Sequence, residues 1–167
     1  RIREIGVGAH GLHGAASHGR ICVDTSTAEP SSTAKIRDDL ARKGTRYGDA
    51  PLARTPKEAE EGRLNTMVGA DDATFAQLKP VLSAYCENIV HAGAPRHGHM
   101  LKLVNNFVAM AIATASADAC PPGPRAGAAL NNLHDIIPAG GATSGLLPRT
   151  PPPTLNSVAA PCPRLPA

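Results

Sequence analysis

The 167-residue sequence is short of aromatic residues: it contains no tryptophan, two phenylalanines and two tyrosines. Any hydrophobic core must therefore be built mainly from Ala, Val, Leu and Ile. Hydrophobic residues still make up 42% of the chain, so one domain with a substantial core, or one and a fraction, can form.

Other absences exclude several classes of protein. No Cys-x-x-Cys pair occurs, which favours reduced thiols in the cytoplasm over a disulfide framework. No run reaches the roughly 20 apolar residues of a membrane span, because Asn105 and Asn106 interrupt the best candidate. We find no signal-peptide pattern. The net charge of +3 is spread along the chain, so we expect neither nucleic-acid binding nor membrane binding.

Three histidines and one cysteine raise the possibility of a zinc site: Cys86, His91, His97 and His99. Their spacing fits no tight pair of ligands, and no second cluster could complete a tetrahedral site. We therefore expect no metal. Instead, residues 93–98 are interpreted as a hinge between domains, with His99 at the mouth of a cleft.

Between residues 21 and 92 the pattern alternates between strand and helix, which predicts an α/β fold with a partial doubly wound, Rossmann-like sheet. Strands are expected at 21–23 (buried), 45–48, 64–68 (at an edge) and 88–91. Helices are expected at 30–44, 57–61 and 73–85. The first buries Ile36 and Leu40 and ends at Gly44. The last has Pro80 as a kink or early break and one apolar face, formed by Phe75, Leu78, Val81 and Leu82.

Residues 97–119 predict one long helix, because helix formers fill the segment and no proline occurs in it. Apolar residues lie on nearly every face, which predicts a buried helix. Lys102, Asn105 and Asn106 interrupt this surface, and buried polar groups are costly unless they are partnered or used. Lys102 and Asn106 share a face and could address one small polar molecule. Alternatively, these side chains extend to solvent or cap neighbouring backbone.

The spacing Gly98-x-x-x-Lys102-x-x-x-Asn106 resembles the catalytic signature of the β-hydroxyacid dehydrogenases, the family of 3-hydroxyisobutyrate dehydrogenase and 6-phosphogluconate dehydrogenase. Other segments follow the family's order over residues 20–119, with a weaker match from 130 to 147. These segments are Val23-Asp24-Thr25-Ser26-Thr27 with Pro30, Asp49-Ala50-Pro51, and Glu61-Gly62-Arg63-Leu64 leading to Met67-Val68-Gly69.

The resemblance implies hydride transfer between a small 3-hydroxy acid and NAD or NADP. Lys102 would be the catalytic base. Ser26 and Thr27 would lie on the cofactor side, although they could equally cap the following helix. The substrate-binding residues would be Ala53, Arg54, Thr55, Gly98, Asn105 and Asn106.

The loop at Ala53-Arg54-Thr55 departs from the family, because most relatives carry Ser-Gly-Gly there. The Arg-Thr pair is similar to the branch that contains sulfolactaldehyde reductase. Arg54 could grip a carboxylate or sulfonate, or could be a solvated loop arginine.

The resemblance also divides the chain. Residues 1–95 would form the C-terminal part of a Rossmann-like NAD(P)-binding domain, and 96–147 the interdomain helix with the start of a helical domain. Eleven of the sixteen prolines fall at or after Pro121, so 148–167 is expected to be a disordered tail.

The motif Gly6-x-Gly8-x-x-Gly11 lacks the preceding strand and the following helix of a dinucleotide fingerprint, so we interpret it as a loop. We expect a fragment without the true phosphate loop, whose ends do not belong to the parent fold and whose activity is weak or absent for lack of that loop. Its partners would be a hydroxy acid or semialdehyde and, at full length, further copies of itself. The alternatives are a non-catalytic binding or dimerisation module and a non-functional remnant.

Overall fold

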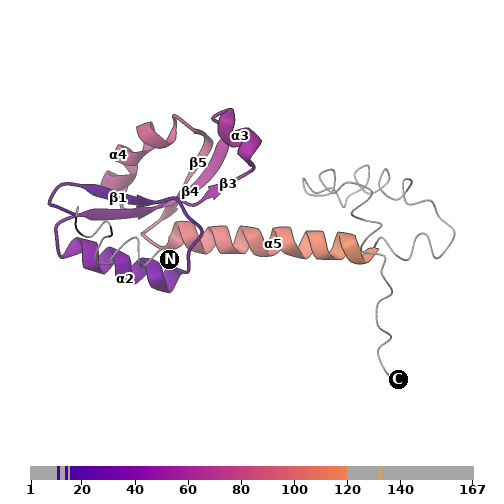
Figure 1. Ribbon diagram of the computed structural model, residues 1–167, viewed down its shortest axis with the longest axis horizontal. Helices are drawn as coiled ribbons and strands as arrows, with labels where there is room; N and C mark the ends of the chain where they lie inside the picture. Colours follow the sequence, from indigo (N-terminus) through magenta and orange to yellow (C-terminus); the bar gives the residue numbers. More distant parts are fainter. Residues whose placement is uncertain (1–10, 12–13, 15, 120–131, 133–167) are drawn as a thin grey trace, which may run out of the picture. The chain divides into compact units, whose positions relative to one another are not determined.

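A computed structural model of the protein describes residues 11, 14, 16–119 and 132. Several predicted features lie outside the described residues: the first two glycines of the glycine motif, the weaker family match at 130–147 apart from Asn132, and the tail at 148–167. The described elements confirm an α/β, Rossmann-like fold followed by a long helix (Figure 1).

The sheet is mixed. Its strands are β1 (Ile21–Asp24), β2 (Arg46–Asp49), β3 (Leu52–Ala53), β4 (Leu64–Gly69) and β5 (Cys86–Gly93). β1 runs parallel to β2, and β5 runs parallel to β4. β4 is antiparallel to β3 and meets β2 at one antiparallel pair, Asp49 with Gly69.

Two predictions about sheet position were wrong. The segment at 64–68 was expected at an edge, but β4 pairs with β2, β3 and β5 and so lies inside the sheet. The segment at 21–23 was expected to be buried, but within the described residues β1 pairs only with β2 and is half-buried. Alternating polarity indicated exposure in β4, yet Leu64, Thr66 and Val68 are all buried there.

Helices cover both faces of the sheet (Figure 1). Side chains alternate between the faces along a strand, so Cys22 packs against α2 (Pro30–Ala41), whereas Ile21 and Val23 pack against α4 (Asp72–Leu82). The core on the α2 side is formed by Ile36, Leu40 and Tyr47. On the α4 side it is formed by Ala50, Val68, Ala70, Leu78 and Leu82. A short helix, α3 (Pro56–Glu60), follows β3.

The helix ends largely follow the sequence signals. Gly44 has a φ of +70° just after α2, as expected of a terminating glycine. In α4, Pro80 lies inside the helix, which ends two residues later at Leu82. The prediction that Val81 belongs to the apolar face was wrong, because Val81 is 64% exposed. Thr74, which was not predicted, belongs to the buried face, since it is fully buried one turn before Leu78.

The long helix α5 (His97–Ala119) has the predicted bounds, but the prediction that it is buried was wrong. Large apolar side chains along it are exposed in this chain, including Phe107 at 74% and Met110 at 61%. No helix in the described part of the chain is long and apolar enough to cross a membrane. The chain divides into two compact units, residues 1–105 and 106–167, within α5.

Two arginines occupy left-handed backbone conformations that favour glycine: Arg54, with a φ of +87°, and Arg96, with a φ of +89°.

Because a β-carbon is unfavourable in the left-handed conformation, we predict that Arg96→Gly stabilises the fold by about 1 kcal/mol in denaturant unfolding. Arg42 has an ordinary φ of −60°, so Arg42→Gly serves as a control that should not stabilise. A lower stability of Arg96→Gly would show that its side chain outweighs the backbone strain.

Candidate active site

The carboxyl ends of β1 and β2 place two aspartates side by side. The two strands are parallel, and Asp24 pairs in register with Asp49. In open α/β sheets, ligands bind at the edge where parallel strands end. This edge also receives the first turn of α5, through the contacts described next.

Asp49 holds the start of α5. Its carboxylate is completely buried; Oδ1 accepts the backbone N–H of Arg96 at 2.6 Å, and Oδ2 accepts that of His99 at 2.7 Å. The first N–H groups of a helix have no partner within the helix, and a negative charge is favourable at that end. Asp49 supplies both a partner and a charge from a strand about fifty residues earlier.

Two glycines make this approach possible. A β-carbon at Gly69 would lie 2.5 Å from Asp49 Oδ1, and one at Gly98 would lie 2.3 Å from the carbonyl oxygen of Met67. Neither distance is compatible with any side chain, so α5 can begin against β4 only because both residues are glycine. The predicted substrate role of Gly98 stays a prediction, and the structure gives the residue a packing role as well.

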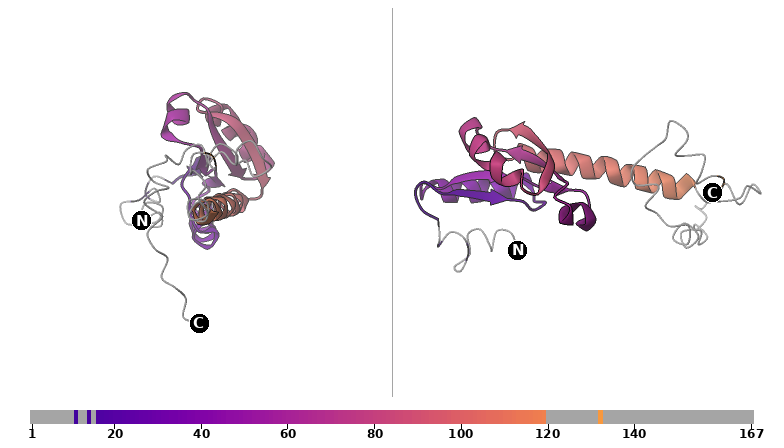
Figure 2. Two further views of the ribbon diagram at one scale, coloured as in Figure 1. Left: turned by 90° about the vertical axis from the view of Figure 1, so that its right-hand side faces the viewer. Right: turned by 90° about the horizontal axis from the view of Figure 1, so that it is seen from above.

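His99 was expected at the mouth of a cleft, which was wrong: it is fully buried. Its Nδ1 lies 2.6 Å from the Thr33 hydroxyl of α2, and its Nε2 lies 3.1 Å from the Ser26 carbonyl oxygen. The amino end of α5 therefore lies beside α2, as Figure 1 and the left view of Figure 2 show. Local sequence patterns could not predict this contact, because Thr33 precedes His99 by 66 residues.

Asp24 organises the loop that follows β1. It accepts the Ser26 N–H at 2.9 Å, the Ser26 hydroxyl at 2.5 Å and the Tyr47 hydroxyl at 3.1 Å. Burial and then the Asp24 charge raise the pKa of Tyr47, so the phenol stays protonated and donates. The residue that caps α2 is Glu29, so Ser26 does not cap that helix. Thr27 is exposed on the same loop.

Lys102 follows His99 by three residues on α5 and is only 8% exposed. Burial lowers the pKa of its amine, which favours the neutral form. Asn105, expected to be buried with it, is exposed, as are most of the α5 side chains that follow Lys102. Asn106 is half-buried and is the first residue of the second unit.

The loop at Ala53, Arg54 and Thr55 forms hydrogen bonds with neighbouring residues of the chain. Arg54 donates through one amino group to the Arg63 carbonyl at 2.7 Å and to the Glu87 carboxylate. The Thr55 backbone N–H and hydroxyl both donate to Glu58, at the start of α3. Arg54 is thus ion-paired rather than simply solvated, and the substrate roles of these residues stay predictions.

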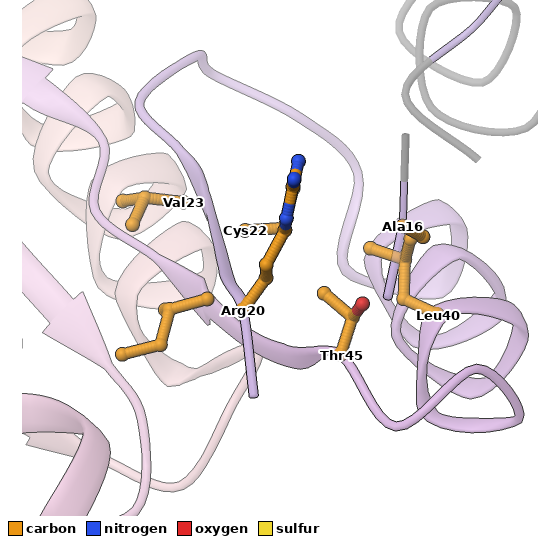
Figure 3. Close-up of a pocket in the computed structure, with 7 residues that line it drawn as sticks. Ala16, Arg20, Cys22, Val23, Leu40 and Thr45 are labelled. Atoms are coloured by element: carbon orange, nitrogen blue, oxygen red, sulfur yellow. The ribbon is translucent and has the colours of Figure 1, made fainter. Parts of the chain in front are cut away.

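A separate hollow of about 260 Å³ lies between β1 and α2 (Figure 3). Burial and then Asp24 raise the pKa of the Cys22 thiol at its wall, so the thiol is a poor nucleophile. None of the predicted site residues lines it: the lining is Ala16, Arg20, Ile21, Cys22, Val23, Leu40 and Thr45. Within the described part of the chain, no group of three His, Cys, Asp or Glu residues is placed to hold a metal ion.

Sequence reasoning missed the buried polar residues that assemble the site. Asp49 was noted only as part of Asp-Ala-Pro, and Thr33 and Tyr47 were not considered. One signal was present: Asp24 and Asp49 each end a short strand, where a charge is costly unless it is partnered. The partners themselves could not be inferred, because they come from other segments.

Comparison with known proteins agrees with the fold. Residues 1–93 match the NAD binding domain of 6-phosphogluconate dehydrogenase. The chain is 37% identical over 138 residues to 2-(hydroxymethyl)glutarate dehydrogenase from Eubacterium barkeri, covering 83% of this chain and 45% of that protein. It is 30% identical to 3-sulfolactaldehyde reductase from Escherichia coli, covering 71% of this chain and 40% of that protein.

Solved structures give the same picture. The 3-hydroxyisobutyrate dehydrogenase of Mycobacterium tuberculosis, solved with L-serine, superposes with a TM-score of 0.73 at 27% identity. The match covers 79% of this chain and 45% of that one. The chain therefore spans less than half the length of each of these three relatives.

We predict that Asp49→Asn destabilises the protein by about 2 kcal/mol, because one of two buried N–H groups loses its acceptor and the helix loses a charge. Thermal and denaturant unfolding measure the effect. Asp39→Asn is the matched control: Asp39 pairs with Arg42 on the surface, so that change should cost less than about 0.5 kcal/mol. Equal effects of the two substitutions would contradict the capping role of Asp49.

Proposed function

Because the chain belongs to the β-hydroxyacid dehydrogenase family, in which it matches the NAD binding domain, we propose that it serves an NAD(P)-dependent oxidoreductase of the 3-hydroxyisobutyrate dehydrogenase type. The substrate would be a small 3-hydroxy acid, or the matching semialdehyde, with a carboxylate or sulfonate group. The observation that carries the proposal is Lys102: a buried amine with a lowered pKa, in the helix that Asp49 fixes to the sheet edge.

Lys102 supplies the proton transfer. In oxidation, the substrate hydroxyl gives its proton to the neutral amine while the carbinol carbon loses hydride and becomes a carbonyl; in reduction, the ammonium returns the proton. A base is effective when its pKa lies near the working pH, and burial shifts the pKa of Lys102 in that direction by lowering it from the ordinary lysine value. NAD(P), when bound, supplies the acceptor or donor of the hydride.

The described residues suit the nicotinamide end of that cofactor. Ser26 and Thr27 follow β1 at the carboxyl edge of the sheet, and Asp24 orders their loop through the two Ser26 bonds. The Ser26 hydroxyl is used within the loop, whereas Thr27 is exposed and free to face a carboxamide. The choice between NAD and NADP is made by residues at the ribose end of the cofactor, not by these residues at its nicotinamide end.

Substrate binding is assigned to residues of two segments, α5 and the loop that follows β3. Asn106 follows Lys102 by one helical turn, so the two side chains leave α5 on the same face and can address one hydroxyl or acid oxygen. Both recorded bonds of Arg54 use the same amino group, which leaves the other edge of its guanidinium for a substrate anion. Thr55 and Ala53 flank it.

One observation favours a second candidate, a non-catalytic binding or dimerisation module. Apolar side chains are exposed along α5, which is typical of a surface that binds another protein. Fluorescence titration with NADH and NADPH distinguishes the two: binding supports the oxidoreductase, and its absence in a chain that unfolds cooperatively supports the module. A chain without a cooperative melt by circular dichroism is a non-functional remnant.

We predict that Lys102→Ala lowers turnover of NAD(P) with short 3-hydroxy acids by about 10²-fold or more, with little change in NADH affinity, because only the proton transfer is lost. Reduced nicotinamide absorbance measures turnover. Lys79→Ala, at an exposed lysine of α4, is the control and should behave like the unsubstituted chain. Near-normal turnover in Lys102→Ala would refute the catalytic role.

We predict that Arg54→Gln raises KM for anionic substrates about tenfold with little change in kcat, since a charge that grips a distal anion acts in ground state and transition state alike. Arg63→Gln is the matched control, because Arg63 also pairs with a carboxylate, Glu61, on the surface. An unchanged KM in Arg54→Gln would leave Arg54 with only its Glu87 and Arg63 contacts.

A further inference from the structure

His99 joins three segments that are distant in sequence. Its ring is fully buried and contacts the Thr33 hydroxyl of α2 at 2.6 Å and the Ser26 carbonyl of the loop after β1 at 3.1 Å. Its own backbone N–H donates to Asp49 at 2.7 Å. The first turn of α5 is therefore held both through its backbone and through this ring.

The partners determine where the ring carries its proton. The Ser26 carbonyl can only accept, so His99 Nε2 must carry hydrogen and donate to it. In the neutral ring Nδ1 then accepts from the Thr33 hydroxyl, which otherwise donates to the Glu29 carbonyl at 3.2 Å. The carboxylates of Asp24 and Asp49 face the ring more distantly, at 4.0 and 3.9 Å from Nε2 and Nδ1.

This hydrogen-bond network lies on the same side of α5 as Lys102. Residues three apart on a helix lie on the same side, so the Lys102 side chain leaves α5 on the side where His99 reaches the Ser26 loop. The burial of Lys102 agrees with that direction. The loop assigned to the nicotinamide and the helix that carries the amine thus meet at one side chain.

We propose that His99 is a positioning residue, which fixes the first turn of α5 against the Ser26 loop and so holds the Lys102 amine at the reacting edge of the sheet. The proposal rests on the proposed function, because it assigns His99 no contact with substrate or cofactor. It predicts that the bond to Ser26 matters more than the bulk of the ring.

The test follows Lys102 directly in the whole chain. The lysines are ¹³C-methylated, the Lys102 resonance is assigned by its loss in Lys102→Arg, and its titration is recorded by NMR. In the unsubstituted chain the pKa lies below the ordinary lysine value, since burial lowers it. In His99→Leu it returns toward the ordinary value, and protection of the α5 first-turn amides against hydrogen exchange falls about tenfold or more.

Two further variants separate positioning from bulk. In His99→Gln the side-chain amide can still donate to Ser26, so this variant should keep the lowered Lys102 pKa. His91→Gln is the matched control: His91 also bonds through Nε2 to a main-chain carbonyl, that of Ala70 at 2.8 Å, but it lies on β5. It should leave Lys102 unchanged. If His99→Leu does not fold, Thr33→Val carries the test, with a smaller shift in the same direction.

The outcomes distinguish the two proposals. A lowered Lys102 pKa that persists in His99→Leu, or in Thr33→Val where that variant carries the test, overturns the positioning role and leaves the proposed function standing. An ordinary Lys102 pKa in the unsubstituted chain overturns the proposed function and the positioning role together. A shift in His99→Leu that His99→Gln does not show supports both.

Discussion

The architecture depends on one buried carboxylate. Asp49 ends β2 and accepts two backbone N–H groups at the start of α5, so it fixes the long helix to the sheet at this junction. A buried charge of this kind is tolerated only because both oxygens are hydrogen-bonded and the helix end is electropositive. Gly69 and Gly98 complete the junction, because any side chain at either position would occupy the space of Asp49 or of the β4 backbone.

The chemistry of the site is built outward from this junction. His99 and Lys102 lie within the first two turns of α5, so both inherit their places from the contact with Asp49. Asp24 performs a similar task on the neighbouring strand, where it orders the loop that contains Ser26. In each case a strand ends in a carboxylate that accepts backbone N–H groups of a neighbouring segment. The side chains assigned to chemistry lie on the segments that these carboxylates hold.

The exposed part of α5 contrasts with this buried end. Lys102, a residue that usually lies in water, is buried, whereas Phe107 and Met110 are exposed. Hydrophobicity alone would predict the opposite, with Lys102 exposed and Phe107 and Met110 buried. The chain spans less than half the length of the relatives described above, and the two units it forms divide within this helix. Burial in α5 therefore reflects what the described chain packs against, not the polarity of each residue.

Local patterns in the sequence were enough for much of the fold. The bounds of α5, the termination of α2 shortly before Gly44 and the alternation of strand and helix follow from helix propensity, glycine conformation and periodicity, all of which act over a few residues. The spacing of Gly98, Lys102 and Asn106 likewise indicated the family and led to the prediction of Lys102 as the catalytic base.

Tertiary structure decided what the patterns could not. The inner position of β4, the half-burial of β1 and the exposure of α5 depend on which neighbours pair with each element. The partners of Asp49 and His99 lie about fifty and about seventy residues away in the chain. Propensity and periodicity carry no information over such separations. Only folding brings these groups together, because only then must each buried polar atom find a partner.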